Sequence, residues 1–132
     1  MRYLLDTHVL IWTLTDVKKL PGETRAVLEN AEHEFFVSAV TFWEMAIKIR
    51  SGRLEPIGRW DSAIPYINQL GFQTISLLPE EAATSKNLTE DTHFDPFDRM
   101  LIWQAITRNM VLVSGDPQFK RFADDGLKLL WK

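Results

Sequence analysis

The sequence predicts an α/β fold with a central parallel sheet of about five strands and helices on both faces. Short apolar runs alternate with segments of helical periodicity along the whole chain, which indicates strands joined by helical crossovers. Such crossovers leave neighbouring strands parallel and are right-handed. The 132 residues, 45% of them hydrophobic, are enough for one domain with a substantial core.

The strands are predicted from apolar runs, of which Tyr3-Leu4-Leu5 and Phe35-Phe36-Val37 are the first two. They are expected near residues 2–6, 34–38, 73–77, 110–114 and 127–131. The segments between them have helical periodicity and are expected to be helices near 7–14, 21–31, 39–51, 61–70, 79–87, 96–109 and 117–123. The stretch 51–60 is predicted to be a loop.

Proline and glycine mark several of these boundaries. Pro21, Pro96 and Pro117 suit the first turn of a helix, where the missing N–H is not needed. Gly52, Gly71 and Gly126 suit helix ends or tight turns. The helix over 39–51 has a broad apolar face and is predicted to be largely buried.

Composition narrows the class of protein. The absence of cysteine excludes disulfides, thiolate zinc sites and cysteine nucleophiles. No apolar run has the length of a membrane span, and the first residues lack the pattern of a signal peptide, so a cytoplasmic location with no membrane partner is expected. The net charge of −3 permits a nucleic-acid partner without arguing for one, because four acidic residues belong to a cluster described next.

Four acidic residues stand where a predicted strand gives way to a helix or in the opening turns of a helix. They are Asp6, Glu44, Asp98 and Asp116. Because parallel strands end at one edge of the sheet, these carboxylates are expected to gather there and to repel one another unless a cation binds. Mg²⁺, with Mn²⁺ as the other choice, prefers such oxygen ligands. The cluster therefore predicts a metal-dependent enzyme that cleaves phosphodiester bonds by activating a water.

Each acid also has a structural explanation. Asp6 and Asp116 could cap the helices that follow them, and Asp98 could be a first-turn acid behind an Asp95 cap. Glu44 has capping-box spacing from Thr41 and could instead pair with Lys48, four residues on. Independent caps have no reason to recur at successive strand ends, which favours the metal site.

The residues around the acids add weaker indications. Thr7 and Ser114 could hydrogen-bond the carboxylates or their waters, or simply begin helices. Arg99 is expected to form a structural ion pair, and the histidines have no metal-ligand spacing. The aromatic side chains could stack on unpaired bases, but Trp12, Trp43 and Trp103 lie in apolar patterns that favour packing in the core.

At these positions the chain resembles the PIN-domain family, and within it the VapC-type toxins of bacterial toxin–antitoxin modules. The resemblance rests on Leu4-Leu5-Asp6-Thr7-His8, on the segment 37–48 that contains Trp43-Glu44, on Asp95-Pro96-Phe97-Asp98-Arg99 and on Val113-Ser114-Gly115-Asp116. The last motif usually reads Thr-x-Asp in the family; here a serine supplies the hydroxyl and glycine stands between. The resemblance covers 1–132 as one PIN-like domain with the three-layer fold.

The resemblance implies a metal-dependent endoribonuclease whose Mg²⁺ or Mn²⁺ is held by the residues matching Asp6, Glu44, Asp98 and Asp116. It further implies a homodimer, inhibition by a cognate antitoxin, and binding of operator DNA through the toxin–antitoxin complex. The alternative is a catalytically silent PIN-fold module for antitoxin pairing and DNA autoregulation, which would be expected to have lost one or more of these acids. A Rossmann or P-loop nucleotide binder is disfavoured, because no glycine-rich turn follows the first strand.

Overall fold

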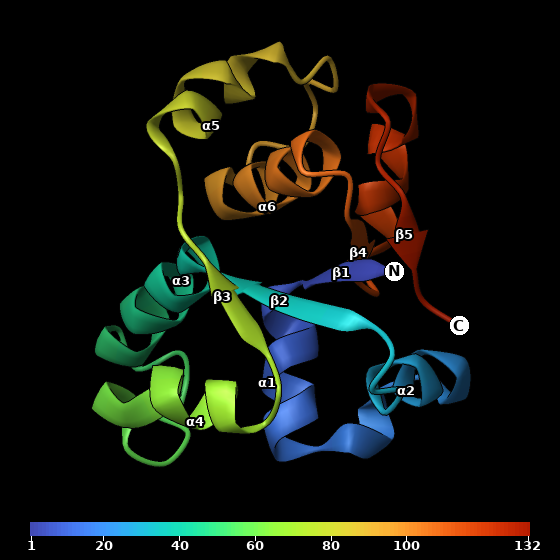
Figure 1. Cartoon of the computed structure of the whole chain (residues 1–132). Helices are drawn as coiled ribbons and strands as arrows, with labels where there is room; N and C mark the ends of the chain where they lie inside the picture. The colour runs from blue at the N-terminus through green and yellow to red at the C-terminus, as the bar shows by residue number, and fades with distance from the viewer.

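The chain forms a five-stranded parallel sheet between two layers of helices (Figure 1). The computed structural model describes all residues from 1 to 132. The strands are β1 (Arg2–Leu5), β2 (Glu34–Ser38), β3 (Gln73–Ile75), β4 (Val111–Val113) and β5 (Leu129–Leu130). They are ordered β3-β2-β1-β4-β5, and each pair is parallel. The α/β class, the three-layer arrangement and the parallel sheet predicted from the sequence are confirmed.

The helices agree with the predicted positions but are divided more finely. The α-helices are α1 (Thr7–Thr15), α2 (Gly22–Leu28), α3 (Ala39–Arg50), α4 (Ala63–Gln69), α5 (Pro79–Thr84) and α6 (Pro96–Thr107). Tighter 3₁₀ turns form η1 (Val17–Lys19), η2 (Trp60–Ser62), η3 (Ser85–Asn87) and η4 (Pro117–Asp125). The segments predicted as helices 61–70 and 79–87 each consist of an α-helix joined to a 3₁₀ turn, as is common at helix ends. No helix is long and apolar enough to cross a membrane.

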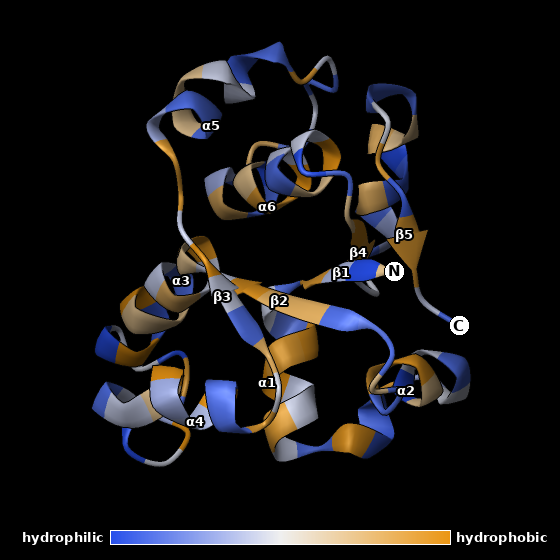
Figure 2. Cartoon of the chain, viewed as in Figure 1, coloured by the Kyte–Doolittle hydropathy of each residue, from blue (hydrophilic) through white to orange (hydrophobic).

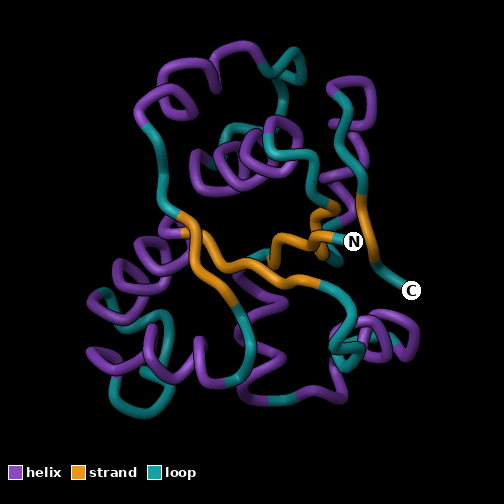
Figure 3. Tube along the Cα trace, viewed as in Figure 1, coloured by secondary structure: helices purple, strands orange, loops and turns teal.

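The sheet separates two hydrophobic cores, as expected for strands buried on both faces. Alternate residues of the strands enter opposite cores: Leu4, Phe36 and Leu112 pack beneath α6 and η4, whereas Leu5 and Val37 pack against α1 and α4. Figure 2 shows hydrophobic colouring along β2 and β5, and Figure 3 shows the strands in the middle with helices on both sides. The period-two alternation explains why the strands could be located from short apolar runs.

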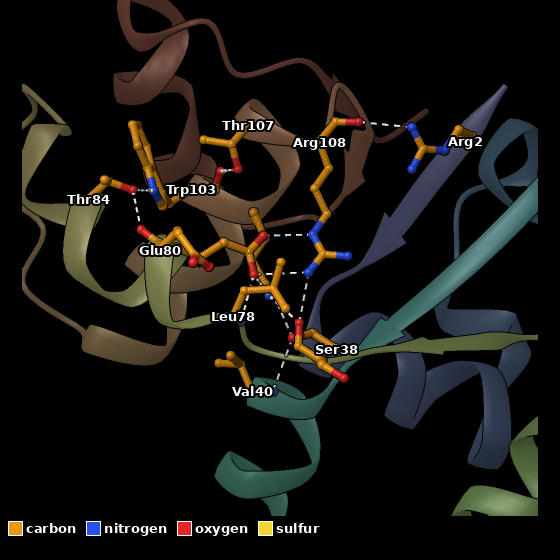
Figure 4. Close-up of polar contacts among 12 residues, drawn as sticks. Arg2, Ser38, Val40, Leu78, Glu80, Thr84, Trp103, Thr107 and Arg108 are labelled. Atoms are coloured by element: carbon orange, nitrogen blue, oxygen red, sulfur yellow. Dashed lines mark hydrogen bonds and ion pairs between the residues drawn. The ribbon is translucent and has the colours of Figure 1, made fainter.

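A buried polar network ties α6 to the loop after β3 and to the start of α3 (Figure 4). Arg108, just after α6, donates from Nε to Oε2 of buried Glu81 at 2.6 Å and from Nη2 to the Ser76 carbonyl at 2.8 Å. Gln104 donates from Nε2 to Oε1 of Glu81 at 3.0 Å and accepts from the hydroxyl of Ser38 at 2.6 Å. The Ser38 oxygen in turn caps α3. The network therefore connects the two helices that carry Glu44 and Asp98.

Candidate functional site

The sequence-predicted acids lie around the carboxyl edge of the sheet. Asp6 follows β1 directly, and Asp116 lies three residues beyond the end of β4. Glu44 lies in the second turn of α3, which leaves β2. Asp98 comes from the first turn of α6, the helix that precedes β4. Parallel strands and their following helices thus bring residues from 6 to 116 to one side of the sheet.

Asp6 is a buried carboxylate held in a fixed orientation. Its Oδ1 accepts from the backbone N–H of Thr7 at 2.7 Å, and its Oδ2 accepts from the hydroxyl of Ser114 at 2.8 Å. It also caps α1, so the capping role considered for it is present. Burial raises the pKa of the Asp6 carboxyl, and the charge of Glu44 adds to this, against lowering contributions from Ser114, His8 and Thr7.

Glu44 is equally buried and bridges two helices. Its Oε1 accepts from the hydroxyl of Thr7 at 2.7 Å, and its Oε2 lies 2.8 Å from Nζ of Lys48. The i,i+4 pair considered from the sequence is therefore present. The capping-box alternative is wrong, because α3 begins after Ser38, which caps it and places Thr41 inside the first turn. Thr7 and Ser114, singled out from the sequence, each donate to a carboxylate.

The pKa of the Asp98 carboxyl is also raised. Burial raises the pKa of its carboxyl to about 6, and the charges of Asp95, Asp6 and Glu44 contribute to the rise, against the hydrogen bond with His93. Nε2 of His93 lies 3.0 Å from Oδ2 of Asp98. Asp95 caps α6 by accepting from the Asp98 N–H at 2.9 Å, as expected.

His93 is a site residue that the sequence analysis did not select. It is buried, and its Nδ1 lies 2.7 Å from Oε1 of Gln118 while its Nε2 faces Asp98. Burial would lower the pKa of His93, but hydrogen bonds to Asp98 and Gln118 and the charges of Asp98 and Asp116 raise it. The only indication of this role in the sequence was that His93 lies five residues before Asp98. Whether the two side chains meet depends on the conformation of the loop between them.

Asp116 stands at the margin of the cluster. Its carboxylate caps η4 by accepting from the N–H of Gln118 at 2.9 Å, and its own N–H donates to the Ser114 hydroxyl at 3.2 Å. Ser114 therefore links Asp116 to Asp6. The side chain is half-buried, less so than those of Asp6 and Glu44.

The donor set is suited to a hard divalent cation, although each carboxylate is turned toward a partner of its own. Asp6, Glu44 and Asp98 are close enough that the charges of Asp6 and Glu44 raise the pKa of Asp98. No three histidine, aspartate or glutamate side chains lie close enough together to hold an ion in this arrangement. Buried carboxylates that raise one another's pKa are nevertheless stabilised in their ionised form by a bound Mg²⁺ or Mn²⁺.

Two expectations about neighbouring residues are wrong. Arg99 forms no ion pair; its Nη1 donates to the carbonyls of Glu90 and His93 and so fixes the loop before α6. Trp43 is 59% exposed rather than part of the core, because α3 buries only one side and the indole lies edge-to-face on Phe97 at its border. Trp12 and Trp103 are half-buried against the two cores.

Gly115 is required by a close approach rather than by its backbone angles. A Cβ atom at this position would lie 2.5 Å from Cε2 of Trp131, well inside van der Waals contact. The expected result of Gly115→Ala is a loss of about 1–3 kcal/mol of unfolding free energy, because the indole must move. Urea denaturation measures this loss. Gly22→Ala is the matched control, since a Cβ there meets nothing within 4 Å; equal losses in both variants would contradict the steric explanation.

Comparisons with known proteins agree with this architecture. The solved structures that the chain resembles include VapBC2 from Rickettsia felis bound to a DNA fragment from its promoter, with a TM-score of 0.75, 18% identity and full coverage of both chains. DNA-bound VapBC from Salmonella typhimurium has a TM-score of 0.71 at 18% identity, with 98% and 97% of the two chains covered. VapBC-1 from nontypeable Haemophilus influenzae has a TM-score of 0.63 at 21% identity, with the same coverage.

At these identities the likeness to solved structures concerns the fold alone. No curated protein sequence matches the chain. The family model of the PIN domain matches residues 3–125, which include all four acids and strands β1 to β4 apart from Arg2. The chain therefore belongs to the PIN-domain family.

Proposed function

We propose that the chain is a metal-dependent endoribonuclease and the toxin of a toxin–antitoxin module. The observation that carries this proposal is that Asp6 and Glu44, both buried, lie with Asp98 at the carboxyl edge of the sheet, where their charges raise the pKa of Asp98. Family membership supports nuclease chemistry, and the similarity to VapBC structures supports pairing with an antitoxin.

In this proposal the residues of the site have different roles in hydrolysis. Asp6, Glu44, Asp98 and Asp116 would hold Mg²⁺ or Mn²⁺. When bound, the ion supplies Lewis acidity that activates a water and stabilises charge on the phosphate oxygens. Thr7 and Ser114 orient two of the carboxylates by hydrogen bonds. Lys48, which lies 2.8 Å from Glu44, would lose this partner if Glu44 held the ion, and its ammonium group would then be available to an RNA phosphate.

The partners follow from the same proposal. A cognate antitoxin would inhibit the enzyme, and the complex of the two would bind operator DNA, as promoter DNA is bound in the VapBC2 structure. The active form would be a homodimer. RNA is the substrate, and in-line hydrolysis would leave a 5′-phosphate and a 3′-hydroxyl.

A catalytically silent PIN module is the second candidate. One observation favours it: Lys48 lies 2.8 Å from Glu44 and competes with a cation for that carboxylate. The presence of all four acids in the sequence favours the enzyme instead. The two candidates differ in whether the protein binds a divalent ion at all.

The test is RNA cleavage by antitoxin-free protein with Mg²⁺, with Mn²⁺ and with EDTA. Cleavage in both metals and none in EDTA is expected, with new 5′-phosphate ends detected by labelling. Calorimetric titration with Mn²⁺ provides a readout independent of the RNA chosen. A folded protein that neither cuts RNA nor binds Mn²⁺ would rule out the nuclease and leave the silent module.

A further inference from the structure

The four acids differ in whether each has a carboxylate oxygen without a partner in the protein. Both oxygens of Asp6 and both of Glu44 contact a hydrogen-bond donor or an ammonium group. In Asp98 and Asp116 only one oxygen does so, Oδ2 of Asp98 and Oδ1 of Asp116. The second oxygen of each is not buried, since neither is among the buried polar atoms that lack a partner. Oδ1 of Asp98 and Oδ2 of Asp116 are therefore the oxygens most accessible to a cation.

A bridge of two side chains connects these two acids. Nε2 of His93 lies 3.0 Å from Oδ2 of Asp98, and its Nδ1 lies 2.7 Å from Oε1 of Gln118. The backbone N–H of Gln118 donates to Oδ1 of Asp116 at 2.9 Å. The bridge thus joins the start of α6 to the start of η4, which are separated in the sequence by β4. We call this pair of residues the His93–Gln118 bridge.

The His93 ring is fixed by its surroundings. It meets the rings of Phe119 and Phe122 edge to face, with centroid distances of 5.8 and 5.9 Å. Both phenylalanines are buried in the core beneath α6. The backbone of His93 is held as well, because its carbonyl accepts from Nη1 of Arg99 at 3.0 Å. A side chain whose rotamer is locked by packing can hold a neighbouring carboxylate in one orientation.

The bridge is compatible with both the neutral and the charged form of the imidazole. A carboxylate that binds a cation is ionised and can only accept, so Nε2 of His93 must donate to Asp98. In the neutral ring, Nδ1 then accepts from the amide nitrogen of Gln118, and in the charged ring it donates to the amide oxygen. Because an amide can present either atom, Gln118 supports the ring in both cases.

We propose that the His93–Gln118 bridge positions Asp98 and Asp116 for a divalent cation and that His93 is a positioning residue of the site. Holding Oδ2 of Asp98 and Oδ1 of Asp116 leaves the other oxygen of each for the ion. Hydrogen bonds of this kind orient metal-binding carboxylates, and their loss typically lowers metal affinity roughly 10–100-fold. The inference rests on the proposed function, because it takes these acids as metal ligands, and it adds the residues that orient two of them.

The experiment measures Mn²⁺ affinity by calorimetric titration, a readout that requires no RNA. His93→Phe keeps an aromatic ring but cannot hydrogen-bond, and it is expected to raise the Kd for Mn²⁺ by about 10–100-fold. His93→Gln restores a donor toward Asp98 and should bind Mn²⁺ within a few fold of the unaltered protein. The matched control is His33→Phe. His33 also lies against two aromatic rings, Tyr3 at 5.3 Å and Phe35 at 6.3 Å, but at the amino end of β2, so its replacement should not change Mn²⁺ affinity.

Gln118 provides a second test that does not disturb the core. Its side chain is exposed, and Gln118→Leu keeps the backbone N–H that donates to Asp116. This variant is expected to weaken Mn²⁺ binding by a few fold. Because the Gln118 side chain acts on Asp98 only through His93, the double variant His93→Phe, Gln118→Leu should bind Mn²⁺ no more weakly than His93→Phe alone. Losses that add would mean that the two residues act independently and would overturn the bridge.

Folding of each variant is verified by circular dichroism and melting curves. If His93→Phe does not fold, Gln118→Leu decides the question, and unchanged Mn²⁺ affinity in that variant overturns the bridge. A His93→Gln variant that is folded but binds as weakly as His93→Phe would also overturn it, because the donor to Asp98 would then have no effect.

The outcomes separate the bridge from the nuclease. Loss of Mn²⁺ affinity in His93→Phe but not in His33→Phe supports the bridge even when no RNA is cut, and in that case only the nuclease fails. Unchanged affinity in folded His93→Phe, or an equal loss in His33→Phe, would overturn the bridge, while metal-dependent cleavage by the unaltered protein would leave the nuclease in place. An unaltered protein that binds no Mn²⁺ would overturn both.

Discussion

The Asp98→Asn variant is expected to cleave RNA at least about a hundredfold more slowly than the unaltered protein while melting at a higher temperature in metal-free buffer. The first effect follows from the proposed role of Asp98 as a metal ligand. Loss of a residue that merely supports a metal ligand already costs roughly 10–100-fold, so loss of the ligand itself should cost more. Cleavage in Mn²⁺ and calorimetric Mn²⁺ affinity are the two measurements.

The second effect follows from the pKa of Asp98, which burial and the charges of Asp95, Asp6 and Glu44 raise from 3.8 to about 6. An acid whose pKa is higher in the folded state destabilises the fold when ionised. Above pH 6 this cost is about 2–3 kcal/mol, and it declines as the pH falls toward 3.8. Asparagine carries no charge at any pH. The stability advantage of Asp98→Asn should therefore be largest near pH 7 and vanish below the ordinary pKa.

The control is Asp95→Asn, which removes a charge only three residues away. Asparagine caps helices as well as aspartate does, so α6 should remain intact. Cleavage by this variant is expected to stay within a few fold of the unaltered protein. If Asp95→Asn and Asp98→Asn lose activity equally, the general negative field matters and a ligand role for Asp98 is wrong. A drop in melting temperature for Asp98→Asn would show that its hydrogen bond with His93 outweighs the charge repulsion.

The fold could be predicted because its signals are local. Strands such as β1 and β2 are short apolar runs, and α6 begins at Pro96 behind an Asp95 cap, both visible in the sequence. The helix type of η4 was harder to predict. Pro117 indicates where the helix starts, but whether its turns are α or 3₁₀ depends on packing against the core. The short β5 was likewise predicted longer than it is, since pairing with β4 ends at Leu130.

Local contacts of the site, such as the Glu44–Lys48 pair, could be predicted, but the partners of its long-range contacts could not, because those residues lie far apart in sequence. Ser114 reaches Asp6 across 108 positions, and no pattern in one sequence indicates that pairing. Gly115 illustrates the same limit. Its neighbours do not require glycine, and the reason for it lies in Trp131, which packs on it from the end of the next strand. Trp43 was placed in the core because its neighbours are apolar, yet only tertiary packing decides which side of α3 is covered.

Replacing Glu81 by glutamine is expected to lower the free energy of unfolding at pH 7 by about 3 kcal/mol. Glu81 is buried and accepts hydrogen bonds from Arg108, Gln104 and the Leu78 N–H. The hydrogen bond from Arg108, with the others, lowers the pKa of Glu81 from 4.5 to about 2. Because each unit of pKa difference corresponds to about 1.4 kcal/mol, the ionised carboxylate contributes a sizeable share of the stability of a small domain.

The pH dependence distinguishes this ion pair from ordinary packing. A carboxyl whose pKa is lower in the folded state contributes its full stability above the unfolded value of 4.5 and loses it as the pH falls toward 2. Urea denaturation from pH 7 to pH 2.5 should therefore show the unaltered protein losing stability over this interval more steeply than Glu81→Gln. Glu80→Gln, an exposed acid in the same turn of α5, is the matched control and should change stability by less than about 0.5 kcal/mol.

The same substitution tests how the fold supports the site. Gln104 holds both Glu81 and Ser38, and Ser38 caps the helix that carries Glu44, so weakening this network loosens α3 relative to α6. Glu81→Gln should then bind Mn²⁺ more weakly at a temperature where it is fully folded, whereas Glu80→Gln should not. Unchanged Mn²⁺ affinity despite the loss of stability would mean that the two helices are positioned by the hydrophobic core beneath α6 alone, with the polar network contributing stability but not geometry.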